Sequence, residues 1–411
     1  MNMIKLITLK AFRLNLVLNN YLKAFVLLFV FCAYSPISHA QTKSDSIKKH
    51  KEKFSFKMLK DTLDGNLDMS YVLMHNNGFI PVPQIVTESA LGGIGLVMAP
   101  VFIKPNKHQV EGEHVAPNIT AAFAGYTANK TWGFGGFRKA SLPKYHLKYT
   151  VGAMYANINM EFYRDIPVVG NKEFDFNFRV AGGFVSVLRE IANTDLYMGL
   201  QYYYGHVDVT PQFQNVEIAD FFKEKDFSSN IGSLGLALEF DKRDNVFTPD
   251  KGWYISSQYQ VNANWTGSDY DFQNFNLEIL KYFQVTPKWV SGLRFQSQLQ
   301  FGDAPFYLEP SVVMRGVPMA KYQGDEVYVL AMEQRYDFLY RWSAIGFGGL
   351  AKAPTKRVSF DDAELVYSYG GGFRYLIARM FKLRTGVDVA WSNNGDFGWY
   401  IVFGCAWNNF N

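Results

Sequence analysis

The sequence is poor in charged residues, in cysteine and in long apolar runs. Charged residues make up 19% of its 411 residues, below the roughly 25% of a typical soluble domain. Beyond residue 41 no apolar run approaches the ~18 residues that cross a bilayer as a helix. The low charge argues against an ordinary water-soluble protein, and the missing runs argue against a helical membrane protein.

Cysteine is nearly absent. Cys32 lies in an apolar N-terminal stretch, so Cys405 is the one thiol of the remaining chain, and an intramolecular disulfide is excluded there. Cys405 stands near the end of an apolar, strand-like stretch. We therefore expect a small lipid-facing or packed side chain at this position rather than a nucleophile.

Catalytic and cofactor motifs are also missing. The chain has no G-x-S-x-G, H-E-x-x-H or P-loop sequence. The glycine-rich stretch at 92–95 does not complete G-x-G-x-x-G, because Met98 stands where glycine is needed. An enzyme such as a phospholipase would need a Ser–His pair on one outer face of a strand, and no alternating segment offers one plainly. We expect no enzyme activity and no cofactor.

Three aspartates, Asp61, Asp64 and Asp68, are closely spaced in the segment DTLDGNLD. Such a cluster could bind Ca²⁺ loosely, but it lacks the EF-hand spacing. We therefore favour a solvated turn and expect no metal site.

The first forty residues have the features of a secretory signal peptide. The cations Lys5, Lys10, Arg13 and Lys23 precede an apolar stretch, and Ser38-His39-Ala40 is a small-x-small cleavage site before Gln41. Without these four cations, the 41 Lys+Arg and 37 Asp+Glu of the whole chain come into balance. The remaining chain thus offers no bulk attraction for nucleic acid.

Aromatic residues and alternating sequence are abundant. Aromatics make up 17% of the chain, and apolar and polar residues alternate in segment after segment. At 293–301 one face carries Leu293, Phe295, Leu299 and Phe301, and the other carries Arg294, Gln296, Gln298 and Gln300. A sandwich core cannot absorb such polar faces on many strands, whereas a water-filled lumen can. The apolar faces then contact lipid, where only a closed barrel satisfies every strand.

We predict an all-β fold: a closed antiparallel transmembrane β-barrel over residues 91–411. It follows a signal peptide (1–40) and a periplasmic tail (41–90), in which Pro81 and Pro83 interrupt regular structure and which could plug the lumen. Strand-like blocks lie near 91–103, 117–127, 131–138, 145–163, 174–190, 194–207, 230–241, 252–265, 270–283, 287–302, 324–338, 340–351, 365–378, 380–391 and 397–408.

These are about fifteen blocks, and the fourth is long enough for two strands. Because bacterial barrels favour even numbers, we expect sixteen strands. Short turns such as 337–340 are expected in the periplasm. The long connections at 209–229, 303–323 and 352–364 are expected outside the cell.

Two segments carry distinctive motifs. The first, at 238–260, has a D-x-R-D-N…P-x-x-G core made of Asp241, Arg243, Asp244, Asn245, Pro249 and Gly252. Its polar run ends one strand, and the proline and glycine set the next. The second, at 310–335, contains Arg315, Gly316, Tyr322 and Gly324, followed by Glu333.

Together with 370–391, these segments resemble the BamA/TamA-type bacterial surface antigen superfamily of outer-membrane assembly and translocation barrels. The resemblance covers roughly residues 75–410. It implies an inward-folded lid loop with Arg315 near its tip and Glu333 as the partner that locks it. A partly desolvated pair of this kind would contribute about 1.5–3 kcal/mol.

The chain departs from the family pattern in two places. The second family acid is replaced by glycine within 345–349, so we expect the lock to be weaker or shared with Asp388. The segment 41–91 has too little room and the wrong pattern for the family's periplasmic client-binding domains. We therefore expect a barrel-only member.

The resemblance implies an integral multi-pass protein of the bacterial outer membrane that aids insertion or translocation of proteins or lipids. It would use a movable lid and a seam between the first and last strands. The alternative is a passive pore or a lipid-handling accessory barrel without insertase activity. Expected partners are outer-membrane lipid and other outer-membrane proteins or assembly machinery. The terminal strand supports membrane insertion, since Trp399, Ile401, Phe403, Cys405 and Trp407 share one face.

Overall fold

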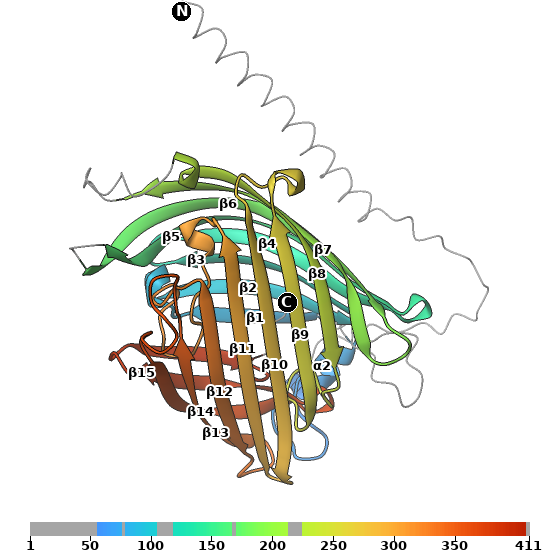
Figure 1. Cartoon of the computed structure of the whole chain (residues 1–411). Coiled ribbons are helices and arrows are strands. Elements are labelled where there is room, and N and C mark those ends of the chain that lie inside the picture. Colours follow the sequence, from blue (N-terminus) through green and yellow to red (C-terminus); the bar gives the residue numbers. More distant parts are fainter. Residues whose placement is uncertain (1–55, 76–78, 105–117, 167–169, 213–223, 408–411) are drawn as a thin grey trace, which may run out of the picture. The chain divides into compact units, whose positions relative to one another are not determined.

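The computed structural model describes residues 56–75, 79–104, 118–166, 170–212 and 224–407. The predicted signal peptide and the first part of the predicted tail lie outside these residues. Sixteen antiparallel strands form one sheet in which every strand pairs with its neighbours in chain order, and the sheet curls into a barrel (Figure 1). The predicted all-β fold and strand number are confirmed.

The strands are β1 (Phe79–Val86), β2 (Gly95–Lys104), β3 (Asn118–Thr127), β4 (Trp132–Leu142), β5 (Leu147–Ile166), β6 (Gly170–Glu190), β7 (Leu196–Pro211), β8 (Ser228–Asp241), β9 (Gly252–Asn262), β10 (Phe272–Thr286), β11 (Trp289–Gly302), β12 (Glu326–Tyr336), β13 (Trp342–Lys352), β14 (Val366–Ala378), β15 (Leu383–Ser392) and β16 (Phe397–Phe403). The 3₁₀-helix η1 (Phe56–Leu59) and the α-helix α2 (Ser70–His75) precede them.

Further 3₁₀-helices lie in connections: η2 (Ser89–Leu91), η3 (Pro143–Tyr145), η5 (Glu224–Asp226), η6 (Asn264–Thr266), η7 (Phe306–Leu308) and η8 (Arg379–Phe381). Across the described ranges, no helix is both long and apolar enough to span a membrane.

The start of the barrel differs from the prediction. The fourth predicted block is one strand, β5, and the sixteenth strand is β1, in a region where Pro81 and Pro83 were expected to interrupt structure. The barrel therefore begins at Phe79 and not at residue 91. The physical reason is that β1 pairs on one side only, and an edge strand tolerates proline.

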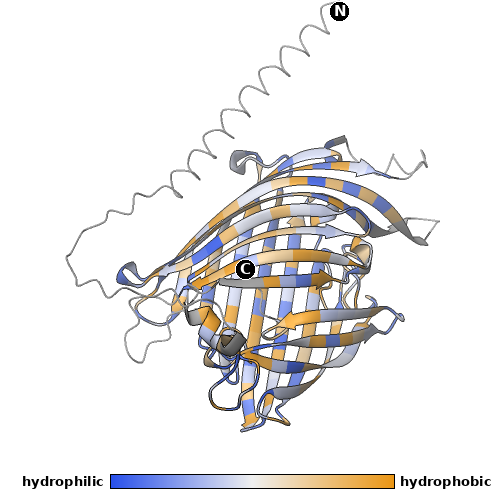
Figure 2. Cartoon of the chain, turned by 180° about the vertical axis from the view of Figure 1, so that it is seen from behind, coloured by the Kyte–Doolittle hydropathy of each residue, from blue (hydrophilic) through white to orange (hydrophobic). Residues whose placement is uncertain are grey.

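Each strand has an apolar outer face and a mixed inner face. On β12, Leu330, Met332 and Tyr336 are exposed, whereas Glu333 and Arg335 are buried. Figure 2 shows hydrophilic and hydrophobic residues alternating along the strands in this way. The expected polar interior is present, but around Glu333 it consists of buried ion pairs rather than open water.

The connections differ in length between the two ends of the barrel. At one end, here called the short-turn end, lie 143–146, 191–195, 242–251, 287–288, 337–341 and 379–382. At the other end, the long-loop end, lie 212–227, 303–325 and 353–365. The connection between β2 and β3, residues 105–117, falls outside the described residues. Which end faces the periplasm stays a prediction.

The end of the last strand also differs from the prediction. β16 stops at Phe403, and Gly404 has a φ of 79° that favours glycine. Cys405 and Trp407 are buried with Leu280 and Tyr282, which lie on the inner face of β10. They therefore do not share the outer face of Trp399, Ile401 and Phe403, because the chain turns into the barrel after the strand.

Candidate functional site in the barrel interior

The connection between β11 and β12, residues 303–325, lies across the barrel interior. At one side Phe306 packs against Phe176 and Phe178 of β6, with a ring-centroid distance of 5.1 Å to Phe176. At the other side Val312 and Val317 are buried against the inner faces of β12, β13 and β14. The connection thus contacts opposite walls, which holds its central residues inside the barrel.

Arg315 lies at the centre of an interior ion cluster. Its Nη2 is 2.7 Å from Glu333 Oε2 of β12, and its Nη1 contacts Asp388 Oδ2 of β15. The guanidinium also stacks on Phe347 of β13, 3.4 Å from the ring centroid. The expected pair with Glu333 and the sharing with Asp388 are both present as contacts. Their role as a lock stays a prediction.

Asp388 binds a second arginine. Arg374 of β14 donates two hydrogen bonds to its carboxylate, of 2.6 and 2.8 Å, and both side chains are almost fully buried. Two arginines, Asp388 and Glu333 thus form a neutral cluster in which each charge has a partner. Bidentate, buried pairs of this kind are the strong ones.

Gly316 fits a position that a larger residue would strain. Its φ is 87°, and a Cβ here would lie 3.0 Å from Ala390 Cβ and from Trp391 N. Its N–H donates to the Tyr400 hydroxyl of β16 at 2.8 Å. The glycine therefore lets the tip of the connection lie directly on β15 and β16.

Tyr322 and Gly324 lie at the base of the same connection, away from the ion cluster. The Tyr322 carbonyl accepts from Val312 N at 2.9 Å, and Gly324 N donates to Pro310 O at 3.1 Å. A Cβ on Gly324 would lie 2.4 Å from Pro354 O. These two residues shape the base of the connection and do not contact Arg315.

The D-x-R-D-N motif forms the turn between β8 and β9 at the short-turn end. Arg243 donates to both carboxylate oxygens of Asp241, at 2.8 and 2.7 Å. Asp244 accepts from the backbone N–H groups of Asp250 and Lys251, and Asn245 accepts from those of Phe247 and Thr248. The polar motif residues therefore satisfy the backbone of a ten-residue turn (242–251).

The same turn has two conformational anchors. Gly252 has a φ of 118°, and a Cβ there would lie 2.1 Å from Lys242 O. Pro249 is fully buried, and its carbonyl accepts from Arg335 Nη1 of β12 at 3.3 Å. The turn is consequently held against β12 from inside the barrel.

The two sequence motifs approach each other around one small cavity. This cavity of about 20 Å³ is lined by Thr248 and Pro249 of the turn, by Glu333 and Arg374 of the ion cluster, and by Cys405. Cys405 Sγ lies 3.2 Å from the Tyr282 hydroxyl. Turn, ion cluster and C-terminal segment together fill the interior at this level.

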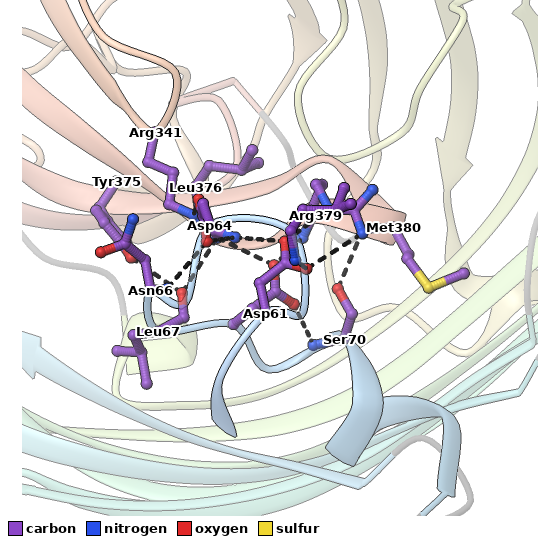
Figure 3. Close-up of polar contacts among 12 residues, drawn as sticks. Asp61, Asp64, Asn66, Leu67, Ser70, Arg341, Tyr375, Leu376, Arg379 and Met380 are labelled. Carbon is purple, nitrogen blue, oxygen red and sulfur yellow. Dashed lines mark hydrogen bonds and ion pairs between the residues drawn. The ribbon is translucent and has the colours of Figure 1, made fainter. Parts of the chain in front are cut away.

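The N-terminal segment 56–75 docks at the short-turn end through its three aspartates (Figure 3). Arg341 donates to Asp61 Oδ2 at 2.6 Å and to Asp68 Oδ2 at 3.0 Å, and it also contacts Asp64. Arg379 Nε donates to Asp61 at 2.8 Å. The expectation of a solvated turn holds for residues 62–67, which are exposed, but it is wrong for Asp61 and Asp68, which are buried against Arg341.

The ion cluster of the N-terminal segment shifts the acidity of its members. The hydrogen bond from Arg379 holds the pKa of Asp61 below its ordinary value, and the hydrogen bond from Arg341 does the same for Asp64. In the described residues, no group of three or more His, Cys, Asp or Glu side chains could hold a metal ion. The aspartates face arginines, and the segment is a docking element.

β1 and β16 meet at a seam without forming a ladder, since no pairing joins them in the sheet. At the long-loop end the Thr87 hydroxyl contacts the Trp399 carbonyl, and Met319 N donates to Glu88 Oε1 at 3.0 Å. At the short-turn end Leu73 of α2 packs with Ile103 of β2 and with Leu383 of β15. The N-terminal segment thus spans the seam from inside.

Sequence reasoning missed several residues of this interior. Arg374, Phe347, Tyr400, Arg341 and Arg379 were not singled out as site residues, and Asp388 only as a substitute acid. One signal was available for Arg374 and Asp388, because alternation places both on the inner face of neighbouring strands. The partners of the aspartates lie more than 270 positions away in the chain, and no local pattern indicates them.

The barrel and its filled interior define a class: a multi-pass integral β-barrel of the bacterial outer membrane. Residues 140–312 match the Omp85 superfamily domain. This match and the fold shared with two solved structures confirm the predicted resemblance to this superfamily of barrels.

Two solved structures share the fold. The crystal structure of BamA from Haemophilus ducreyi lacking POTRA domains 1–3 matches with a TM-score of 0.54 at 9% identity, over 85% of this chain and 81% of that one. CdiB from Escherichia coli matches with a TM-score of 0.53 at 10% identity, over 78% of this chain and 61% of that one. No match is found among curated proteins.

Proposed function

We propose that this protein aids the insertion or translocation of polypeptides at the outer membrane, by moving the 303–325 connection and opening the seam between β1 and β16. One observation carries the proposal. The interior is filled by segments that ion pairs and hydrogen bonds hold, while the adjoining seam has no backbone ladder. Such an interior suits regulated passage better than free diffusion.

The Omp85 domain and the fold shared with BamA and CdiB support the proposal. In this proposal Arg315 is the movable contact, and Glu333 and Asp388 hold it in the closed arrangement. A cleaved signal peptide delivers the chain to the outer membrane. Outer-membrane lipid and other outer-membrane proteins are its partners, and no catalytic group takes part.

A passive pore is the second candidate, because one observation favours it. An interior cavity of about 310 Å³ lies against the inner faces of β4 to β10, and charged and polar side chains such as Lys148, Gln201, Glu239 and Tyr254 form part of its lining. Water in this space would provide part of a conducting path. The buried cluster around Arg315 would still have to open for ions to cross.

Depletion proteomics tests the proposal. Depleting the protein should lower the amounts of several other outer-membrane barrels, because their insertion or translocation would lose its route. Wild-type protein supplied in trans should restore those amounts, and Arg315→Ala should restore them less. Arg357→Ala is the matched control, since Arg357 is exposed in another long loop at the same end. An unchanged outer-membrane proteome after depletion would contradict the proposal and favour the pore.

A further inference from the structure

The seam leaves two backbone edges without a strand partner. Among the residues that the structure describes, β1 pairs only with β2, and β16 pairs only with β15. Lipid offers no partner for backbone N–H and C=O groups, so an open edge at membrane depth is costly. An open edge is also a template on which another strand can add. The two edges of this seam are chemically unequal.

The register of β1 shows which of its residues face the seam. Pro81 lies opposite Pro100 of β2. Neither proline has an N–H, so this pair cannot exchange the two hydrogen bonds of a hydrogen-bonded pair. The ladder to β2 is therefore carried by the alternate residues Ile80, Val82 and Gln84. The backbone nitrogens of Phe79, Pro81, Pro83 and Ile85 face the free edge.

Half of the donor positions on the free edge of β1 are thus proline nitrogens. The two prolines are consecutive on that edge, which leaves its middle without any donor. β16, in contrast, has no proline between Phe397 and Phe403, and every one of its residues keeps an N–H. Edge prolines are a known device against strand pairing.

We propose that Pro81 and Pro83 keep the seam from closing as a continuous β-ladder and restrict strand addition at the seam to β16. The partner that fits is an extended polypeptide segment, because only another backbone supplies alternating donors and acceptors along seven residues. The assignment of transported chains as the partner of β16 rests on the proposed function. The chemical asymmetry of the two edges is independent of that function.

In the closed arrangement other contacts replace the ladder. At the long-loop end the Thr87 hydroxyl contacts the Trp399 carbonyl across the seam, and the Met319–Glu88 hydrogen bond joins the residues after β1 to the 303–325 connection. The buried packing of Leu73 between the two sides holds the short-turn end. Opening the seam therefore requires side-chain contacts to break, and no continuous ladder of backbone hydrogen bonds.

Hydrogen–deuterium exchange of β16 in detergent micelles tests the inference. In the wild type, the peptide covering residues 397–403 should exchange faster than the doubly paired β14. Pro81→Val/Pro83→Val restores two donors for the β16 carbonyls, which lets the two edges close as a ladder, so exchange of the β16 amides should slow by about tenfold or more. Pro100→Val is the matched control, since its nitrogen faces β3, and it should leave β16 unchanged. Equal protection of β16 in wild type and double variant would overturn the inference.

A second arm uses wild-type barrel, so it does not depend on folding of a variant. A synthetic peptide of residues 79–86 with Pro81→Val and Pro83→Val should slow exchange at β16 when added in excess. The native peptide of the same residues, with both prolines, should not. Protection by both peptides, or by neither, contradicts the inference. Neither exchange experiment requires transport. A negative depletion experiment therefore contradicts the proposed function alone, and a negative exchange experiment contradicts the edge asymmetry alone.

Discussion

At the level of single residues, Asp388 holds the interior together more than Glu333 does. Asp388 is 0% exposed and contacts both Arg315 and Arg374, whereas Glu333 contacts Arg315 alone within this cluster. Removing one partner of a buried pair leaves an uncompensated charge, which is costly because water cannot reach it.

We predict that Asp388→Asn lowers the free energy of unfolding by about 3–5 kcal/mol, because two arginines lose their shared carboxylate. Glu333→Gln should cost about 1–3 kcal/mol, since Arg315 keeps Asp388. Urea titration of the barrel in detergent micelles measures both. Asp303→Asn is the control: Asp303 is exposed and its partner Lys225 is partly exposed, so its cost should stay below about 1 kcal/mol. Equal costs for Asp388→Asn and Glu333→Gln would falsify the assignment.

At the level of elements, alternation in the sequence was enough to locate fifteen of the sixteen strands. The prediction missed β1 because proline is excluded only from strands that are paired on both sides. The sequence does not indicate which strand lies at the edge of the sheet. The prediction also failed after Phe403 because alternation continues through Cys405 and Trp407 while the backbone turns at Gly404. Local alternation indicates on which face of the sheet a residue lies, but it does not indicate where the chain leaves the sheet.

The candidate site could be predicted only in part, for a similar reason. Arg315 and Glu333 lie close in the chain, and a motif marks them. The aspartates Asp61, Asp64 and Asp68 were visible as a cluster, yet their arginine partners are brought to them by closure of the barrel. Burial and long-range pairing turned an expected solvated turn into a docking element.

The N-terminal segment should stay docked at neutral pH and detach in acid. The pKa values of Asp61 and Asp64 are lowered in the folded protein. Their stabilising contribution is therefore fully present above the ordinary aspartate value of 3.8, and it is lost as the pH falls below that value. Protonated aspartates no longer attract Arg341 and Arg379.

Limited proteolysis measures this pH dependence with an acid-active protease. We expect residues 56–75 to resist cleavage at about pH 5 and to be cut only at about pH 1.5, as the pH falls through the lowered pKa values of Asp61 and Asp64. The sheet should keep its circular dichroism spectrum at both values. Arg341→Gln should be cut already at about pH 5, because Asp64 and Asp68 lose their arginine. Resistance at about pH 1.5 in the wild type would show that packing of Leu73, and not charge, holds the segment.

At the level of the whole molecule, the barrel interior is occupied at two separate levels. The 303–325 connection with its Arg315 cluster contacts the walls from the long-loop end, and residues 56–75 dock at the short-turn end. Because β1 starts at Phe79, a deletion that extends into residues 79–86 would remove a barrel strand together with the plug. Point substitutions that release residues 303–325 or residues 56–75 leave the barrel strands intact, and they therefore test each interior segment separately.

Two closures in series make a distinct prediction for ion conductance. An ion crosses only when both closures are open, so the probability of an open path is the product of the opening probabilities of the two closures. Arg315→Ala and the pair Arg341→Gln/Arg379→Gln should each raise the conductance across a planar bilayer only modestly, as brief openings. The triple variant should conduct far more than the sum of the two, because neither closure remains to interrupt the current. Arg357→Gln, which leaves both clusters intact, should behave as wild type. If the triple variant conducts no more than the two separate variants added together, the two closures lie in parallel paths, and the interior is not a single gated route.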